Sequence, residues 1–242
     1  VQARDGKLQL TLTFRGEQEF YLSIFAPGEP AQPRTRLSVF SMERDLYERR
    51  PYRGDLHVHS SHSHDGLESP GYLAGSYRKA GYDFIAITDH GNMFGIKLFY
   101  DVCRKKGIKP ILGVEAYVAR VSLYNKEKPV DRSGEHLIIL AKNLQGYLNL
   151  IKLCSVAFVD GYYYRPRIDK ALLEKHHEGL IISSACLGGE ICQKIMAGDI
   201  EGAEAAALWY KNLVGEDYYL EVMRHPAAAA KERAEVYENQ VK

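Results

Sequence analysis

Two histidines separated by one residue, His57 and His59, are the sharpest chemical feature of the sequence. The run GDLHVH predicts a strand over 54–59, and side chains two positions apart in a strand point to the same side. Two imidazoles on one side make half of a metal site, because imidazole is a common metal ligand. The alternative is a pair of histidines on a polar strand face with no ion between them.

Other potential ligands follow this pair. Asp65 lies in the next loop and offers a hard oxygen ligand, whereas His62 and His64 are more typical of solvated loop residues. His90 ends a second predicted strand, and Asp89 beside it is expected to orient an imidazole from outside the metal shell. These positions extend the candidate site beyond the first two histidines.

Glu115 stands inside the apolar run ILGVEAYV. A buried carboxylate without a partner costs several kcal/mol, so this residue needs a cationic side chain or a metal. His136 opens a later strand and Cys186 closes another, although Cys186 alone would fit a small buried residue equally well. Together, four histidines, one aspartate, one glutamate and one cysteine suit two or three divalent ions, Zn, Mn or Fe, that share a bridging carboxylate.

The elements that must position these residues alternate between strand and helix from residue 54 onward. We expect strands at 54–59, 84–90, 109–119, 136–142, 180–186 and 218–225, and helices at 69–81, 93–107, 144–158, 199–215 and 227–242. Such alternation is typical of parallel βα units. Because the candidate ligands follow several different strands, the pattern favours an α/β barrel with its site at the carboxyl ends over an open doubly wound sheet.

Residues 1–50 differ from this pattern. Short β-branched or aromatic runs at 8–14, 20–25 and 37–42 predict a small antiparallel β appendage, followed by a polar linker. The expected domains are therefore a β-rich part over 1–50 and a barrel over 51–242.

The composition narrows the function classes. The 242 residues are 45% hydrophobic and 26% charged, which is typical of a globular protein. The formal net charge of +1 excludes a strong overall field for nucleic acid, so any such contact must be local. We expect no membrane span and no signal peptide, and the cysteine spacing fits a reducing cytoplasm.

The order HVH, HDG, TDH, GVE, H and SAC resembles the PHP (polymerase and histidinol phosphatase) superfamily of metal-dependent phosphoesterases over about residues 50–225. This resemblance implies a distorted (β/α)7 TIM-like barrel with up to three metals. It also implies that a metal-activated water attacks phosphorus, so that no protein nucleophile is needed. The positions that match metal ligands are His57, His59, Asp65, His90, Glu115, His136 and Cys186.

Residues from about 90 to 225 also resemble the PHP domain of the bacterial DNA polymerase III α subunit, through TDHGNMFG, KKGIKPILGVEAYVA and SACLGGEI. In some members this domain is a 3′–5′ exonuclease, and in others it is structural. The resemblance implies a phosphoester substrate such as the 3′ end of single-stranded DNA, other replicase subunits as partners and a cytoplasmic location. A chain of this length is too short to polymerise DNA by itself.

The sequence departs from that branch in two ways. Residues 1–90 resemble stand-alone PHP phosphoesterases, which leaves a hybrid chain and a natural intermediate lineage as alternatives. The late Asp-x-His motif of the family is missing, which predicts weakened metal sites and a barrel that lacks its last strand; His225 is either a substitute ligand or part of a polar turn. A structural module, an engineered scaffold and a stand-alone small-molecule phosphatase therefore stay open as alternative functions.

A basic, aromatic segment, YYYRPR, spans 162–167. Arginines can bind phosphate oxygens and tyrosines can stack on bases, so Arg165 and Arg167 are candidate substrate ligands. The alternative is that both arginines pair with neighbouring groups of the fold.

Overall fold

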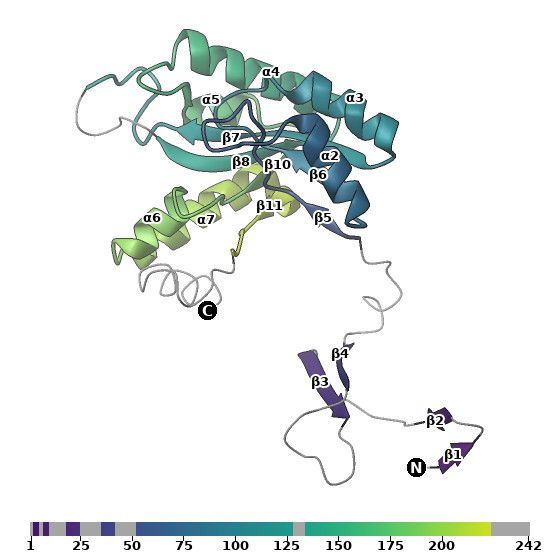
Figure 1. The fold of residues 1–242 in the computed structure, drawn as a ribbon. Helices are drawn as coiled ribbons and strands as arrows, with labels where there is room; N and C mark the ends of the chain where they lie inside the picture. The colour runs from purple at the N-terminus through teal and green to yellow at the C-terminus, as the bar shows by residue number, and fades with distance from the viewer. Residues whose placement is uncertain are drawn as a thin grey trace. The chain divides into compact units, whose positions relative to one another are not determined.

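The computed structural model describes residues 2–4, 7–9, 18–24, 35–41, 52–127 and 134–223. The chain divides into two compact units, Val1–Pro51 and Tyr52–Lys242. In the first unit, β1 (Gln2–Arg4) pairs antiparallel with β2 (Lys7–Gln9), and β3 (Gln18–Ile24) pairs antiparallel with β4 (Thr35–Ser41) (Figure 1). The described strands thus form two separate pairs, where the sequence predicted one small sheet.

The second unit is built on one curled seven-stranded sheet with the order β11-β10-β8-β7-β6-β5, and β9 pairs with β7 beside this path. Its strands are β5 (Gly54–Asp55), β6 (Phe84–Ile87), β7 (Lys109–Val118), β8 (Glu135–Ala141), β9 (Arg167–Ile168), β10 (Leu180–Ser183) and β11 (Tyr218–Tyr219).

One strand of this sheet runs against the expected direction. The pairs β5–β6, β6–β7, β7–β9 and β10–β11 are parallel, but β8 is antiparallel to both β7 and β10. The prediction of parallel βα units throughout is therefore wrong for β8. The described part of the connection before it, residues 119–127, contains no helix, whereas parallel neighbours are usually joined by a crossover helix.

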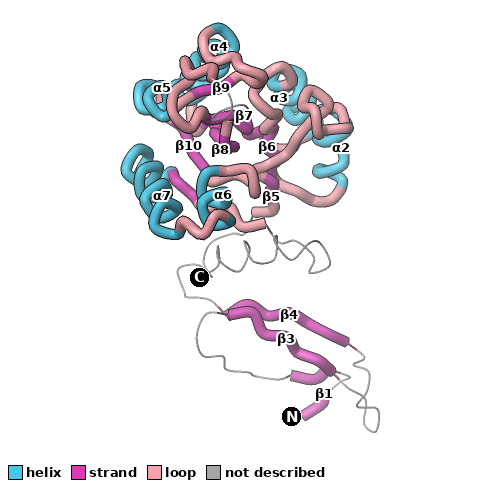
Figure 2. The backbone as a smooth tube through the Cα atoms, turned by 90° about the vertical axis from the view of Figure 1, so that its left-hand side faces the viewer, coloured by secondary structure: helices cyan, strands magenta, loops and turns pink. Residues whose placement is uncertain are grey.

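The helices lie around the outside of the curled strands (Figure 2). They are α2 (Pro70–Lys79), α3 (Ile96–Lys106), α4 (Leu144–Val159), α5 (Lys170–Lys175), α6 (Glu190–Met196) and α7 (Ile200–Val214), with a 3-10 turn η1 (Gly215–Asp217). The expected start of α2 is confirmed, because Ser69 caps it by accepting a hydrogen bond from the Tyr72 amide. The short elements β9, α5 and α6 were not predicted, and the expected helix at 227–242 lies outside the described residues.

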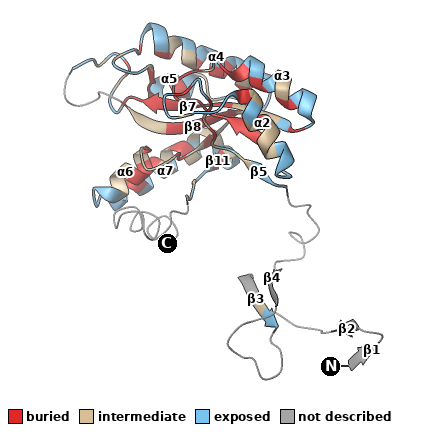
Figure 3. Cartoon of the chain, in the orientation of Figure 1, coloured by how far each residue is buried: buried red, intermediate tan, exposed pale blue. Residues whose placement is uncertain are grey.

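Successive side chains of β7 point alternately into the hydrophobic core and toward the candidate site. Val114, Ala116 and Val118 belong to a hydrophobic cluster shared with α4. The residues between them, Glu115 and Tyr117, project to the opposite face of the sheet, because strand side chains alternate. Figure 3 shows the buried positions concentrated on the strands and on the helix faces that cover them. The inner face of the curled sheet thus carries Glu115 and Tyr117, beside a smaller apolar cluster that includes Ile138 and Leu140.

Among the described residues, every helix is too short or too polar to cross a bilayer.

Candidate metal centre

The segment that carries His57 and His59 is held by Thr88 rather than by a regular strand. β5 ends at Asp55, so the predicted strand 54–59 is too long. Beyond it, the Thr88 hydroxyl accepts from the Val58 amide at 2.9 Å, and the Thr88 amide donates to the Val58 carbonyl at 2.8 Å. These bonds keep the segment extended, so both imidazoles face the interior as the alternation predicted.

Asp89 anchors the turn that follows. Its carboxylate accepts from the Ser60 amide at 2.5 Å and from the Ser60 hydroxyl at 2.7 Å. The expectation that Asp89 orients an imidazole is therefore wrong, because both of its oxygens hold Ser60. The contact still serves the site, since it fixes the residue next to His59.

His90 reaches the site by a parallel bridge to Glu115 just beyond the end of β6. Gly91 follows with a φ of 64°, which glycine adopts without cost, and a Cβ there would lie 2.8 Å from Cγ of Pro166. A glycine at this position therefore lets the chain turn away from the site while His90 stays beside β7.

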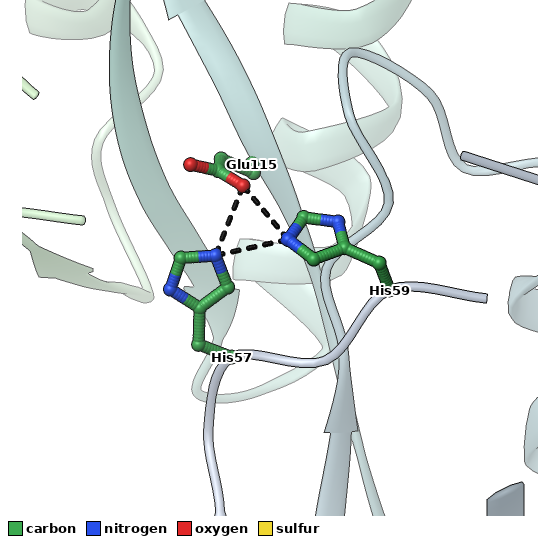
Figure 4. Close-up of side chains that lie close together, drawn as sticks. All are labelled: His57, His59 and Glu115. Carbon is green, nitrogen blue, oxygen red and sulfur yellow. Dashed lines mark hydrogen bonds and ion pairs between the residues drawn. The ribbon is translucent and has the colours of Figure 1, made fainter. Parts of the chain in front are cut away.

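Three imidazoles converge on one oxygen of Glu115. Oε2 of Glu115 lies 2.9 Å from Nε2 of His57, 3.0 Å from Nε2 of His59 and 3.2 Å from Nε2 of His90. Figure 4 shows the first two pointing at this carboxylate, with their Nε2 atoms 3.0 Å apart. Glu115 is only 1% exposed.

The second oxygen of Glu115 faces two further candidate ligands. Its Oε1 lies 2.9 Å from Nδ1 of His136 and 3.4 Å from Sγ of Cys186. The thiol is also 3.3 Å from Nδ1 of His136. The antiparallel register of β7 and β8 places His136 opposite Tyr117, two positions from Glu115 on the same face of the sheet.

Asp65 completes the cluster from the loop after His59. Its carboxylate lies 3.1 Å from Nε2 of His90 and 3.6 Å from Nδ1 of His59, and it accepts from Ser63 at 2.6 Å. The structure therefore brings all seven candidate ligands into one cluster.

The geometry of this cluster fits divalent cations. Three N–H donors cannot all bond to one carboxylate oxygen, which has two lone pairs. When each bond is about 2.0–2.2 Å long, ligand atoms on one ion lie about 2.8–3.1 Å apart in octahedral geometry and about 3.3–3.6 Å apart in tetrahedral geometry. The distances from Oε2 of Glu115 to the three imidazoles, 2.9, 3.0 and 3.2 Å, lie within this span. In three overlapping groups, the ligand atoms lie close enough to one another to hold one ion. The groups are His57, His59 and Glu115; His59, Asp65 and His90; and His90, Glu115 and His136.

Burial and mutual hydrogen bonds set the charges of the metal-free cluster. Burial alone would lower the pKa of His57, but Glu115 and Glu221 outweigh it and raise that pKa to about 10. Burial alone would raise the pKa of Glu115, yet hydrogen bonds from His136, His57 and His59 hold it well below its usual range. Burial lowers the pKa of His90 to about 4, so its imidazole is neutral at pH 7, as metal binding requires.

The Cys186 thiol behaves differently from these groups. Burial, reinforced by the charge of Glu115, raises the pKa of Cys186 to about 12. The thiol is therefore protonated in the metal-free cluster, whereas a bound cation would deprotonate it.

Glu221 belongs to the cluster but was not predicted as part of it. Its Oε1 accepts from Nδ1 of His57 at 2.7 Å. The predicted strand 218–225 contained this acid, but β11 ends at Tyr219, so Glu221 follows a strand end, as His57 and His90 do. That position is the signal by which the sequence could have revealed it.

The two arginines of the 162–167 segment have different surroundings. Arg167 is fully buried and donates to the carbonyls of Gly161, Leu123 and Asn125. These contacts hold its guanidinium in the fold, so we leave Arg167 out of the substrate contacts proposed below. Arg165 is exposed, and its guanidinium carbon lies 5.7 Å from the ring centre of Tyr117, which itself packs on His90 at 5.3 Å.

His62, His64 and His225 are the other histidines that the sequence offered near the candidate site. His62 and His64 belong to none of the three ligand groups, although the His64 ring packs 4.9 Å from that of His90. His225 lies outside the described residues.

Known proteins resemble this chain over the part that contains the cluster. Residues 55–225 match the family model described as PHP domain. The DNA polymerase III subunit alpha of Borreliella burgdorferi is 48% identical over 172 residues, which cover 70% of this chain and 15% of that protein. The same subunit of Treponema pallidum is 45% identical over 173 residues, again 70% of this chain and 15% of the relative. The chain therefore spans about 15% of the length of these curated relatives.

Among solved structures, an amidohydrolase from Chromobacterium violaceum aligns over 78% of this chain and 96% of its own, with a TM-score of 0.38 and 14% identity.

Proposed function

The chain belongs to the PHP domain family, and we propose that its metal centre hydrolyses phosphoesters, with the 3′ end of single-stranded DNA as substrate. The observation that carries this proposal is the convergence of three imidazole nitrogens on Oε2 of the buried Glu115. Such a donor set suits divalent ions far better than it suits a network of hydrogen bonds.

We assign two or three ions, Zn, Mn or Fe, to the three overlapping ligand groups. When bound, such ions supply an activated water and neutralise charge on the phosphoryl oxygens. The two oxygens of Glu115 face different candidate ligands, so this residue would help to hold more than one ion, and the thiol of Cys186 beside His136 favours Zn.

Arg165 is the substrate contact that the structure supports. It is exposed, and it lies over Tyr117, whose ring packs on both His90 and His136 at 5.3 Å. A guanidinium at this place can bind a phosphate oxygen that approaches the ions. The chain needs no nucleophile of its own for this reaction, because the attacking group is water.

DNA is the proposed substrate because of the similarity to DNA polymerase III subunit alpha. The same similarity makes other replicase subunits the proposed partners. Two alternative functions remain: a structural PHP domain without catalytic activity, and a phosphatase for small phosphoesters. The following experiment distinguishes both from this proposal.

The experiment offers single-stranded DNA labelled at its 5′ end, and separately an aryl phosphate, to the chain loaded with Zn²⁺ or Mn²⁺. We expect the DNA to shorten from its 3′ end. Glu115→Gln should lower the rate by at least about 100-fold, since loss of a partner outside the metal shell alone costs 10–100-fold. His177→Ala is the matched control, because this histidine lies in the loop after α5, where its Nδ1 contacts the Glu174 carbonyl, and it belongs to none of the three ligand groups. Cleavage of the aryl phosphate alone, or of neither substrate, would contradict the proposal.

A further inference from the structure

The two edge strands of the curled sheet meet through a pair of side chains. β5 and β11 stand at opposite ends of the strand order, and they do not pair with each other. His57 follows β5 and Glu221 follows β11, and Nδ1 of His57 lies 2.7 Å from Oε1 of Glu221. A histidine–carboxylate contact therefore bridges the two edges at the end of the sheet where the candidate metal centre lies.

Glu221 is itself fixed by β10 and the residue that follows it. Ser183 donates its hydroxyl to Oε2 of Glu221 at 2.8 Å. The Glu221 amide donates to the Ser184 hydroxyl, also at 2.8 Å. Because both the carboxylate and the backbone are held, Oε1 has a defined position toward the imidazole.

His57 differs in this respect from His90 and His59. Nδ1 of His90 has no hydrogen-bond partner among the described residues. Nδ1 of His59 lies 3.5 Å from Ser63 and 3.6 Å from Asp65, beyond a strong hydrogen bond. His57 thus combines an Nε2 that faces Glu115 with an Nδ1 held by a carboxylate, the arrangement that fixes a metal-binding imidazole in one tautomer and one orientation.

We infer that Glu221 is a positioning residue for the metal centre: it keeps the proton of His57 on Nδ1 and aims Nε2 at the ion shared with His59 and Glu115. This inference rests on the proposed metal site. It assigns to the segment after β11 a role in metal affinity, and it predicts that one ion depends on Glu221 while the ion beside Cys186 does not.

The test is a Co²⁺ titration of the 242-residue chain, followed by absorption. Co²⁺ reports the geometry of its ligands, and a separate sulfur-to-metal band reports the site that contains Cys186. We expect Glu221→Ala to weaken the binding of one ion by about 10–100-fold and to leave the sulfur-to-metal band unchanged. Glu204→Ala, an exposed glutamate on α7, is the matched control and should bind Co²⁺ like the unaltered chain.

Two milder variants keep the test decisive if Glu221→Ala fails to fold, which thermal unfolding of the metal-free forms would reveal. Glu221→Gln can still accept from Nδ1 and should lose less affinity than Glu221→Ala. Ser183→Ala removes the donor to Oε2 and should also cause a smaller loss. Equal Co²⁺ affinity in all variants would overturn the inference alone, whereas absence of Co²⁺ binding by the unaltered chain would overturn both it and the proposed function.

Discussion

Glu115 shows how a charged residue can occupy a core position. Its carboxylate is 1% exposed in an otherwise apolar part of β7, where an unpaired charge would cost several kcal/mol. Four imidazole nitrogens and one sulfur lie within 3.4 Å of its two oxygens. Its neighbours on the outer face pack against α4, so the same strand supplies both core and ligand.

Cys186 is expected to determine which metal is preferred. A thiolate is a soft ligand that favours Zn²⁺ over Mn²⁺. Cys186→Ser should therefore weaken Zn²⁺ binding by about tenfold or more while Mn²⁺ binding changes little. Competition titrations with a metal-sensitive dye would measure both affinities. An equal loss for both metals would show that Cys186 acts only through packing.

Metal binding should also release a proton from His57. Its pKa is raised from 6.5 to about 10, so at pH 7.5 the metal-free imidazole is protonated on both nitrogens. An ion that binds Nε2 must displace the proton there. Affinity should rise between pH 6.5 and 10. The raised pKa also stabilises the metal-free fold, and this contribution is complete below pH 6.5. The free energy of unfolding of the metal-free chain should therefore fall as the pH rises from 6.5 to 10.

Calorimetry in buffers of different ionisation enthalpy would count the protons released at pH 7.5. We expect His57→Ala to release about one proton fewer for each chain that binds metal. The same count in both proteins would contradict the charge state assigned to His57.

At the scale of elements, the long strands and helices were predictable because their hydrophobic patterns are local. The direction of β8 was not, because it depends on the connection from β7 and not on the residues of β8 itself. β9, α5 and α6 were missed because two, six and seven residues carry little periodicity.

Most of the candidate ligands could be found from the sequence because they lie within predicted strands, mostly at or near a strand end. The role of Thr88 and Asp89 in holding the His57 segment could not, since it depends on contacts across 29 or 30 residues.

Arg167 illustrates the same limit and allows a direct test. It was a candidate substrate ligand, yet its buried guanidinium donates to three backbone carbonyls. Arg167→Ala would leave these acceptors unpaired, each at about 1–3 kcal/mol, so the free energy of unfolding should fall by about 3 kcal/mol or more. Urea denaturation of the metal-free chain would measure it, with Arg165→Ala as control. Unchanged stability combined with weaker DNA binding would restore the substrate role.

At the scale of the whole molecule, the candidate metal centre lies within one compact unit. All seven candidate ligands and Glu221 lie in Tyr52–Lys242, and the PHP model covers 55–225. Residue 90 is where the resemblance changes from stand-alone PHP phosphoesterases to the polymerase subunit. The family match extends across this residue, so both sides belong to one PHP domain. The hybrid origin stays a prediction. The relatives are much longer proteins, of which this chain spans about 15%.

Removal of the first unit should therefore leave metal binding intact. A chain that begins at residue 52 should bind the same number of ions per molecule as the full chain, because it keeps every candidate ligand. Elemental analysis after metal loading and gel filtration would compare the two. Loss of ions from a shortened chain that still folds would show that residues 1–51 contribute to the site.

The most direct test of the account is a crystal structure of the metal-loaded chain, with anomalous diffraction recorded at the Zn and Mn absorption edges. We expect anomalous peaks between His57, His59 and Glu115, and between Glu115, His90 and His136, with the two oxygens of Glu115 on different ions. Loaded crystals without a peak at Glu115, or with peaks only at surface residues, would contradict it.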